Sequence, residues 1–230
     1  TSHLPDPWSD APLEQGITSY YTDLLYGRIS FAILEDRKFK SGPAGLVEHD
    51  GKRPDHIRDP EIDPKTVDVE GAVLLGEEQL KFLNHWAASW EGVDLKATLS
   101  QTIFGAMATH HGSKLEHILM DMDSNGWPQK GRARALEILR TCMALMIGGD
   151  QHLSTVVQHG IKQYDDAGFS FCVPSIANFY PRAWRPEGEP EFALSEKSTQ
   201  PYTGSFKDGF GNFVTVYAHT NPDEPSGHEP

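Results

Sequence analysis

The segment ALMIGGDQH, residues 144–152, joins an apolar run to two residues that can bind a metal ion. The run ends at two glycines, and the carboxylate of Asp150 and the imidazole of His152 follow two residues apart. Such a run predicts a buried strand of an α/β sheet, and these sheets bind ligands at the carboxyl ends of their strands. In an extended segment residues i and i+2 point to the same side, so both side chains are expected to reach one centre.

An oxygen ligand beside a nitrogen ligand suits iron, manganese, zinc or calcium better than a thiolate site would. The two glycines are expected to let the backbone approach its neighbours closely. The alternative interpretation is an Asp150 that caps the next turn beside an unrelated His152, because so short a motif often occurs by chance.

The elements around this segment predict a mixed α and β chain. The run RISFAILE, residues 28–35, is apolar, β-branched and aromatic, which predicts a buried strand. Acidic Glu77 and Glu78 precede an apolar pattern at helical spacing, which predicts an amphipathic helix with Trp86 and Trp90 in the core. Further expectations are strands at 94–100, 143–147, 154–157, 170–173 and 213–217, a helix at 130–139, a long surface excursion at 41–69, and loops at 180–190 and 191–204 held by Trp184 and Tyr202.

Composition places the chain among ordinary globular proteins, with 230 residues, 38% hydrophobic, 10% aromatic and 23% charged. The formal net charge of −13 argues against nucleic acid or an anionic membrane as a partner. The sequence contains neither a long apolar run that predicts a membrane span nor the pattern of a signal peptide. Cys142 and Cys172 both lie in apolar settings and are expected to be small buried hydrophobes.

Five ordered segments carry a family resemblance. They are YYTD (20–23) leading into YGRISFAILEDR (26–37), then LGEEQ (75–79), LSQ (99–101), DSNGWP (123–128) and GDQH (149–152). In this order they resemble the later half of the PhoD-type alkaline phosphatases, which belong to the calcineurin-like metallophosphoesterases. The resemblance runs from about Tyr20 to Ala218.

The resemblance implies an α/β fold, namely the carboxy-terminal half of a metallophosphoesterase-type α/β/β/α sandwich over residues 1–220, with a turn-rich tail at 221–230. It implies hydrolysis of small phosphate mono- or diesters at a centre of iron and calcium, with zinc or manganese as other options. Asp150 and His152 match the GD-x-H of the family and would be metal ligands. Family members are often exported, which implies a periplasmic or secreted location.

The chain departs from the family in lacking the earlier ligand motifs, D-x-[HC], GD-x-x-D and [GD]-[ND]-H-[DE]. In the family these precede the strand that corresponds to RISFAILE. An amino-terminal half is therefore expected to complete the site, and without it an uncovered sheet face and edge are expected to pair with another chain. The alternatives are a non-catalytic metallophosphoesterase-like binding module and a hydrolase of another anionic ester, such as a sulfate.

Two further residues are candidates for substrate binding. Arg37 follows a buried strand at its carboxyl end, where its guanidinium can hold a phosphate through two hydrogen bonds. The alternative for Arg37 is a simple ion pair with a neighbouring carboxylate. Asn125, with Asp123 and Trp127, resembles the family's loop over the mouth of the active site. A plain Asn-Gly turn with positive φ explains Asn125 equally well.

Three other polar residues have simpler interpretations. His110 and His111 are adjacent, so at most one of them can reach a given metal or leaving group, and both are expected to be solvent-exposed loop residues. Asn178 is expected to be a loop amide bonded to the backbone.

Overall fold

The computed structural model describes residues 7–8, 20–49, 53–174, 180–194 and 201–221. Asn178, most of the tail at 221–230 and part of the loop at 191–204 lie outside the described residues. No helix in the described part of the chain is long and apolar enough to cross a bilayer.

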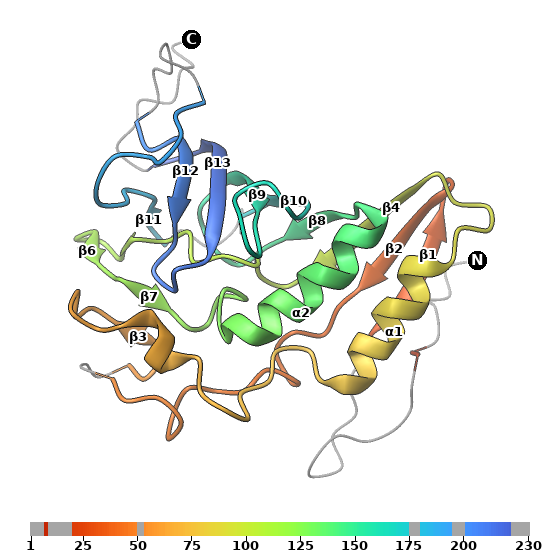
Figure 1. Ribbon diagram of the computed structural model, residues 1–230, viewed down its shortest axis with the longest axis horizontal. Coiled ribbons are helices and arrows are strands. Elements are labelled where there is room, and N and C mark those ends of the chain that lie inside the picture. Colours follow the sequence, from red (N-terminus) through yellow and green to blue (C-terminus); the bar gives the residue numbers. More distant parts are fainter. Residues whose placement is uncertain (1–6, 9–19, 50–52, 175–179, 195–200, 222–230) are drawn as a thin grey trace.

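The fold is mixed α/β, built on one large sheet of parallel and antiparallel strands (Figure 1). Its strand order is β1 (Thr22–Tyr26), β2 (Ile29–Ile33), β4 (Leu95–Ser100), β8 (Leu145–Gly148), β10 (Phe169–Cys172), β9 (Thr155–His159), β13 (Phe213–His219) and β12 (Gly204–Lys207). The central neighbours β2, β4, β8 and β10 pair in parallel, and the pairs at both edges are antiparallel. The carboxyl ends of four central strands therefore meet at one edge of the sheet.

Helices α1 (Glu77–Ala88) and α2 (Gln129–Leu139) cross in front of these strands in Figure 1, and two 3₁₀ turns (Pro64–Val67 and Arg140–Cys142) accompany them. Apolar side chains of both helices, including Leu83 and Leu136, share one buried cluster with Ala32 and Met146 of the sheet. Burial of such side chains contributes about 25 cal/mol per Å² of apolar surface, so this interface anchors the central strands.

Strand β4 turns its polar residues toward the helices, which the alternation in the sequence did not indicate. Lys96 and Thr98 are buried, whereas Leu95 on the other face is exposed. The Lys96 ammonium donates hydrogen bonds to the carbonyls of Trp86 and Ser89 at the end of α1. A cation is favourable there because the last carbonyls of a helix lack partners within the helix.

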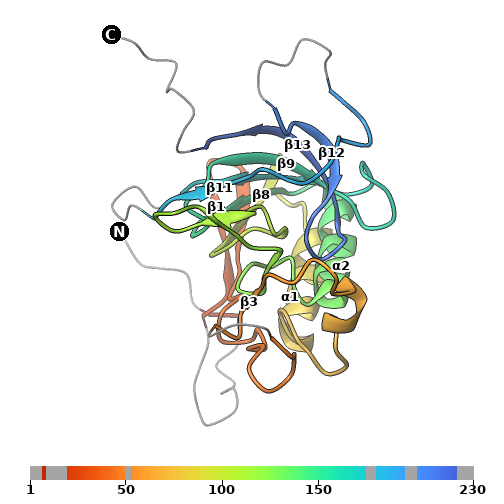
Figure 2. The ribbon, with the colours of Figure 1, turned by 90° about the vertical axis from the view of Figure 1, so that its left-hand side faces the viewer.

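The face of the sheet opposite the helices remains half-exposed. Figure 2 shows α1, α2 and the β3 segment on the same side of strands β9 and β13. Across the other face, paired positions bring together apolar side chains that solvent still reaches: Leu24, Ile29, Phe31, Ile33, Leu95, Leu145, Ile147, Phe169 and Phe171. The exposed fractions of Leu95 and Phe171 are 46% and 41%, so this face is an apolar surface.

The long excursion at 41–69 packs back onto the molecule through its own apolar cluster. Val47, Ile57 and Val67 lie buried with Met120 and Trp127. Short strands fix this region: β3 (His56–Ile57) pairs with β7 (Met120–Asp121), and β5 (His110–His111) pairs with β6 (Glu116–His117) and β11 (Arg182–Ala183).

Most sequence expectations for this frame are confirmed, and the differences concern Trp90, the expected loops and one edge strand. Trp86 is buried but Trp90 is 45% exposed, because it lies beyond the end of α1. Strand β11 lies inside the loop expected at 180–190, and strand β12 begins at Gly204, the last residue of the loop expected at 191–204. Strand β1, on the sheet edge, was not predicted from its composition. Cys142 and Cys172 are free and buried as expected.

Candidate active site

A polar cluster lies where β2, β4 and β8 end, at the edge that the sequence predicted. Residues 35–40 follow β2, residues 101–104 follow β4, and Gly149 to His152 follow β8. The loop at 121–127 closes over them through hydrogen bonds described below. Neighbouring parallel strands end at the same edge, which is why segments far apart in sequence meet here.

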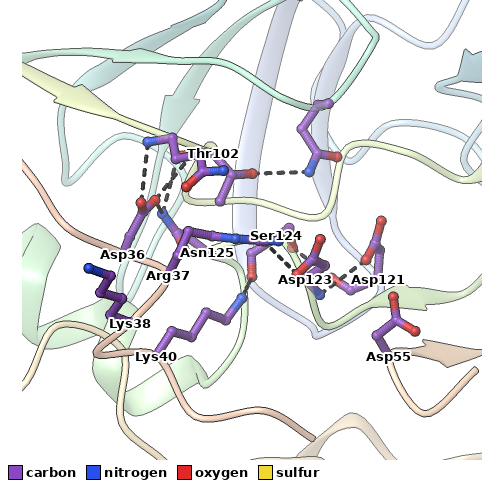
Figure 3. Close-up of polar contacts among 12 residues, drawn as sticks. Asp36, Arg37, Lys38, Lys40, Asp55, Thr102, Asp121, Asp123, Ser124 and Asn125 are labelled. Atoms are coloured by element: carbon purple, nitrogen blue, oxygen red, sulfur yellow. Dashed lines mark hydrogen bonds and ion pairs between the residues drawn. The ribbon is translucent and has the colours of Figure 1, made fainter. Parts of the chain in front are cut away.

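Asp36 is the centre of the hydrogen bonds in this cluster (Figure 3). Its carboxylate is buried and accepts from the Ser100 hydroxyl at 2.7 Å and from the Asn125 amide at 2.5 Å. The backbone N–H groups of Gln101 and Thr102 donate to it at 3.3 and 3.2 Å. Asp36 thus ties the end of β2 to the end of β4 and to the 121–127 loop.

Arg37 points away from this centre and pairs with Asp123, with 2.6 Å between Nη1 and Oδ1. Both side chains are 38% exposed, and no other atom of the Arg37 guanidinium has a hydrogen-bond partner among the described residues. Partial burial lowers the pKa of Arg37, but the carboxylates of Asp123, Asp150 and Asp36 outweigh it and raise the pKa above its ordinary value. Arg37 therefore presents donors that no described residue uses, near enough to Asp150 to feel its charge.

The GD-x-H segment is not extended, which corrects the geometry expected from the sequence. Asp150 and His152 have φ of 65° and 52°, the left-handed region. The N–H of Gln151 donates to the carbonyl of Gly149 at 2.8 Å and closes a three-residue turn around Asp150. Such backbone strain in residues other than glycine is costly and concentrates at functional sites.

The side chains of Asp150 and His152 are both half-buried, and neither makes a hydrogen bond or ion pair within the described residues. The His152 ring lies 5.8 Å from the ring of Tyr180. Gln151 between them points inward: it is buried and donates to Thr102 Oγ1 at 3.0 Å. The turn thus holds Gln151 in the protein and leaves two potential metal ligands available.

The close approach of Ile103 explains why strand β8 ends in a glycine, Gly148. A Cβ on Gly148 would lie 2.6 Å from Ile103 Cγ2 and 3.2 Å from the Ile103 backbone nitrogen. The close approach expected from the two glycines is therefore made by the chain that follows β4.

Asn125 is fully buried and is not part of a turn with positive φ, because Gly126 does not adopt that conformation. Its N–H donates to the carbonyl of Ile103 at 3.0 Å, and its side-chain amide nitrogen donates to Asp36. The Asn125 side-chain oxygen has no hydrogen-bond partner among the described residues. The structure thus buries the Asn125 side chain against Asp36, with one acceptor that no described residue uses.

His110 and His111 are not exposed loop residues, contrary to expectation. They form β5, and His111 is buried. Its ring nitrogens lie 2.9 Å from the Tyr180 hydroxyl and 3.3 Å from Arg58 Nη2. Its ring also packs edge-on against His56, with ring centroids 4.7 Å apart.

A second group of potential metal ligands lies beside this pair of rings. The ligand atoms of Asp55, His56 and Asp121 all lie within 4.8 Å of one another. Asp121 also accepts a hydrogen bond from Arg182 at 2.5 Å, and the same Arg182 nitrogen lies 3.4 Å from Gln151 Oε1. These three residues were not predicted from the sequence. Strands β3 and β7, which bring them together, have two residues each and are too short to show a periodic pattern.

Lys40 reaches the site from the segment after β2 and donates to the carbonyl of Ser124. Burial lowers the pKa of Lys40 to about 8, although Asp123 and Asp121 partly oppose the shift. This ammonium loses its charge closer to neutrality than an ordinary lysine does.

Replacing Lys40 with Met is expected to remove the change in the free energy of unfolding that Lys40 causes between pH 8 and 10.5. The unfolded chain titrates near the ordinary value of 10.5 and the folded chain near 8, so the unfolded chain binds more protons between these values. The free energy of unfolding of the wild type therefore gains a rising contribution from pH 8 to 10.5. Denaturant titrations across this range should show the advantage of Lys40→Met shrinking as pH rises; parallel curves would contradict the assignment.

Comparison with known proteins supports the fold alone. No protein-family model matches the sequence, and no curated protein matches it. Among solved structures the chain resembles PhoD, with 22% sequence identity and a TM-score of 0.51. The match covers 76% of this chain and 32% of the PhoD chain, so this chain spans about a third of that protein's length.

Proposed function

We propose that this chain forms part of a metal-dependent, PhoD-like phosphoric ester hydrolase, an alkaline phosphatase or phosphodiesterase. The observation that carries the proposal is the GD-x-H turn at the carboxyl end of β8, beside the free donors of Arg37, in a chain with a PhoD-like fold. A metal ligand pair beside a guanidinium suits the binding and hydrolysis of a phosphate ester, because the metal polarises the phosphoryl oxygens and the guanidinium binds them.

Asp150 and His152 fit a metal ion by their chemistry and by their lack of other partners in the described residues. A carboxylate oxygen and a ring nitrogen suit iron, zinc or manganese, and the oxygen suits calcium. Catalytic metals usually hold about three protein ligands or more. We therefore propose that the remaining ligands come from a segment outside the described residues.

The bound metal ions would lower the pKa of a water molecule and neutralise the phosphoryl oxygens. The residues of this chain have separate tasks. Arg37 binds the phosphoryl oxygens with the donors that Asp123 does not use, and Asp123 holds the guanidinium in place. Asn125 and Asp36 keep the loop over the site fixed, because their hydrogen bond joins that loop to β2 and β4.

Substrate assays test the proposed class of reaction directly. The protein, loaded with iron and calcium, should hydrolyse p-nitrophenyl phosphate or bis(p-nitrophenyl) phosphate and leave p-nitrophenyl sulfate intact. Sulfate hydrolysis alone would indicate a different anionic ester. Hydrolysis of none of the three by any metal-loaded form, including the chain joined to an amino-terminal half from a PhoD protein, would favour a non-catalytic module.

Replacing Arg37 with Lys is expected to lower kcat/KM for the phosphate ester about tenfold, which corresponds to about 1.4 kcal/mol. The charge is kept, but a lysine ammonium cannot reproduce the planar fork that binds two oxygens at once. Steady-state kinetics on the same substrate measure the effect.

Arg28 provides the matched control for this substitution. It forms a two-point ion pair with Asp94 at the opposite end of β2, with both N···O distances 2.6 Å. Arg28→Lys should leave the kinetics unchanged. If Arg37→Lys also leaves kcat/KM unchanged, Arg37 does not bind the substrate and only forms its ion pair with Asp123.

A further inference from the structure

His56 is a buried imidazole without a hydrogen bond. It is 3% exposed, and neither of its ring nitrogens has a hydrogen-bond partner among the described residues. Its Nε2 lies 3.6 Å from Asp55 Oδ2, an ion-pair distance that is too long for a hydrogen bond. A buried polar group without a hydrogen bond in a folded protein needs an explanation.

Two carboxylates stand beside this ring in fixed positions. His56 lies directly opposite Asp121 in the antiparallel pair of β3 and β7, and Asp55 immediately precedes β3. Asp121 is 1% exposed, and Figure 3 shows Asp55 and Asp121 next to each other. One nitrogen and two carboxylate oxygens within 4.8 Å of one another form a donor set for a borderline divalent ion.

We propose that Asp55, His56 and Asp121 bind a divalent transition-metal ion such as Zn²⁺ at a site separate from Asp150 and His152. The inference does not depend on the proposed hydrolase activity, because it stands on the buried His56 ring, which has no hydrogen bond within the described residues, and on its two carboxylate neighbours. Such an ion would join the excursion after β2 to the strand that leads into the loop of Asp123 and Asn125.

Two arginines set the strength expected of this site. Arg53 pairs with Asp55 at 2.5 Å, and Arg182 pairs with Asp121 at the same distance. The Arg53 side chain is 57% exposed and can turn into solvent, whereas Arg182 is 12% exposed and stays close. Because the ion must compete with these cations, its affinity should be moderate. Added salt should weaken its binding little, because the Asp121 carboxylate is buried and salt screens buried charges less than exposed ones.

The direct test is a titration with Co²⁺, a coloured substitute for Zn²⁺, on the protein carrying Asp150→Ala and His152→Ala. These two changes remove the other candidate ligands, so the remaining signal does not come from Asp150 or His152. We expect one equivalent of Co²⁺ to give visible absorption bands. A hundredfold excess over Kd should raise Tm by about 5–10 °C.

Variants at the site decide between this proposal and nonspecific binding. His56→Gln should abolish both the absorption bands and the rise in Tm. Asp55→Asn should weaken binding at least tenfold without unfolding the protein, because the Asp55 side chain is 17% exposed and an amide of the same shape replaces it. His110→Gln, in the adjacent β5, is the matched histidine control and should bind Co²⁺ normally.

The result that overturns the proposal is equally specific. Absence of bands and of a Tm shift in the Asp150→Ala, His152→Ala protein shows that the site binds no such ion. Identical titrations for His56→Gln and His110→Gln show that the ion binds elsewhere. Neither result bears on phosphate ester hydrolysis, which the substrate assays test separately.

Discussion

Replacing Asp150 or His152 with Ala is expected to lower phosphate ester hydrolysis by at least about a hundredfold in the complete, metal-loaded enzyme. Loss of a residue that only supports a metal ligand typically costs 10–100-fold in metal affinity or activity, so loss of a ligand itself should cost more. Bound metal should fall in parallel, because removing one ligand opens the coordination sphere of the ion. Steady-state kinetics and elemental analysis on the same preparations measure both effects.

Matched controls separate this result from a general loss of structure. His85→Gln, at an exposed histidine in the last turn of α1, and Asp94→Asn, at an exposed carboxylate, should keep full activity and metal content. Both Ala variants should unfold cooperatively, with circular dichroism spectra like that of the wild type. Wild-type turnover with unchanged metal in both Ala variants would contradict the assignment of Asp150 and His152 as ligands.

Replacing Asp36 with Ala is expected to lower the free energy of unfolding by about 3 kcal/mol, which corresponds to a fall in Tm of roughly 6–12 °C. The substitution leaves the N–H groups of Gln101 and Thr102 without their acceptor, and for a buried group such as that of Thr102 this loss costs roughly 1–3 kcal/mol. Asn125 and Ser100 have other acceptors nearby and lose less. Denaturant unfolding measures the change.

Asp36→Asn gives a graded comparison, because one side-chain oxygen remains to accept from the backbone. It should cost less than Asp36→Ala. Asp94→Ala removes an exposed carboxylate with a surface ion pair and should change stability little. If Asp36→Ala is no more destabilising than Asp94→Ala, the hydrogen bonds around Asp36 do not hold the three segments together.

The central frame could be predicted because its signals are local. The apolar run at 28–35, the helical spacing behind Glu77 and the run before Gly148 each fall within one element, so period and propensity suffice. The position of Asp150 at a strand end follows from the same reasoning. Edge strand β1 was not predicted, because its residues Asp23 to Tyr26 are exposed and do not alternate between apolar and polar side chains.

The candidate site was only partly predictable, because its contacts join distant segments. The hydrogen bonds of Asp36 reach residues 64 to 89 positions away, and no local pattern records them. The left-handed turn at Asp150 is accompanied by a hydrogen bond from Gln151 to Thr102, which lies 49 residues earlier. His56 and Asp121 meet through a strand pair of two residues each. The roles of Asp150, His152, Arg37 and Asn125 stay predictions.

The half-exposed apolar face of the sheet sets how the protein should respond to ionic strength. At low salt a formal charge of −13 keeps molecules apart by mutual repulsion. At about 0.1 M salt the Debye length falls to roughly 10 Å and this repulsion is largely screened, whereas attraction between apolar faces is not. Sulfate strengthens that attraction further. Self-association through this face therefore grows as salt is added, the opposite of an assembly held by surface ion pairs.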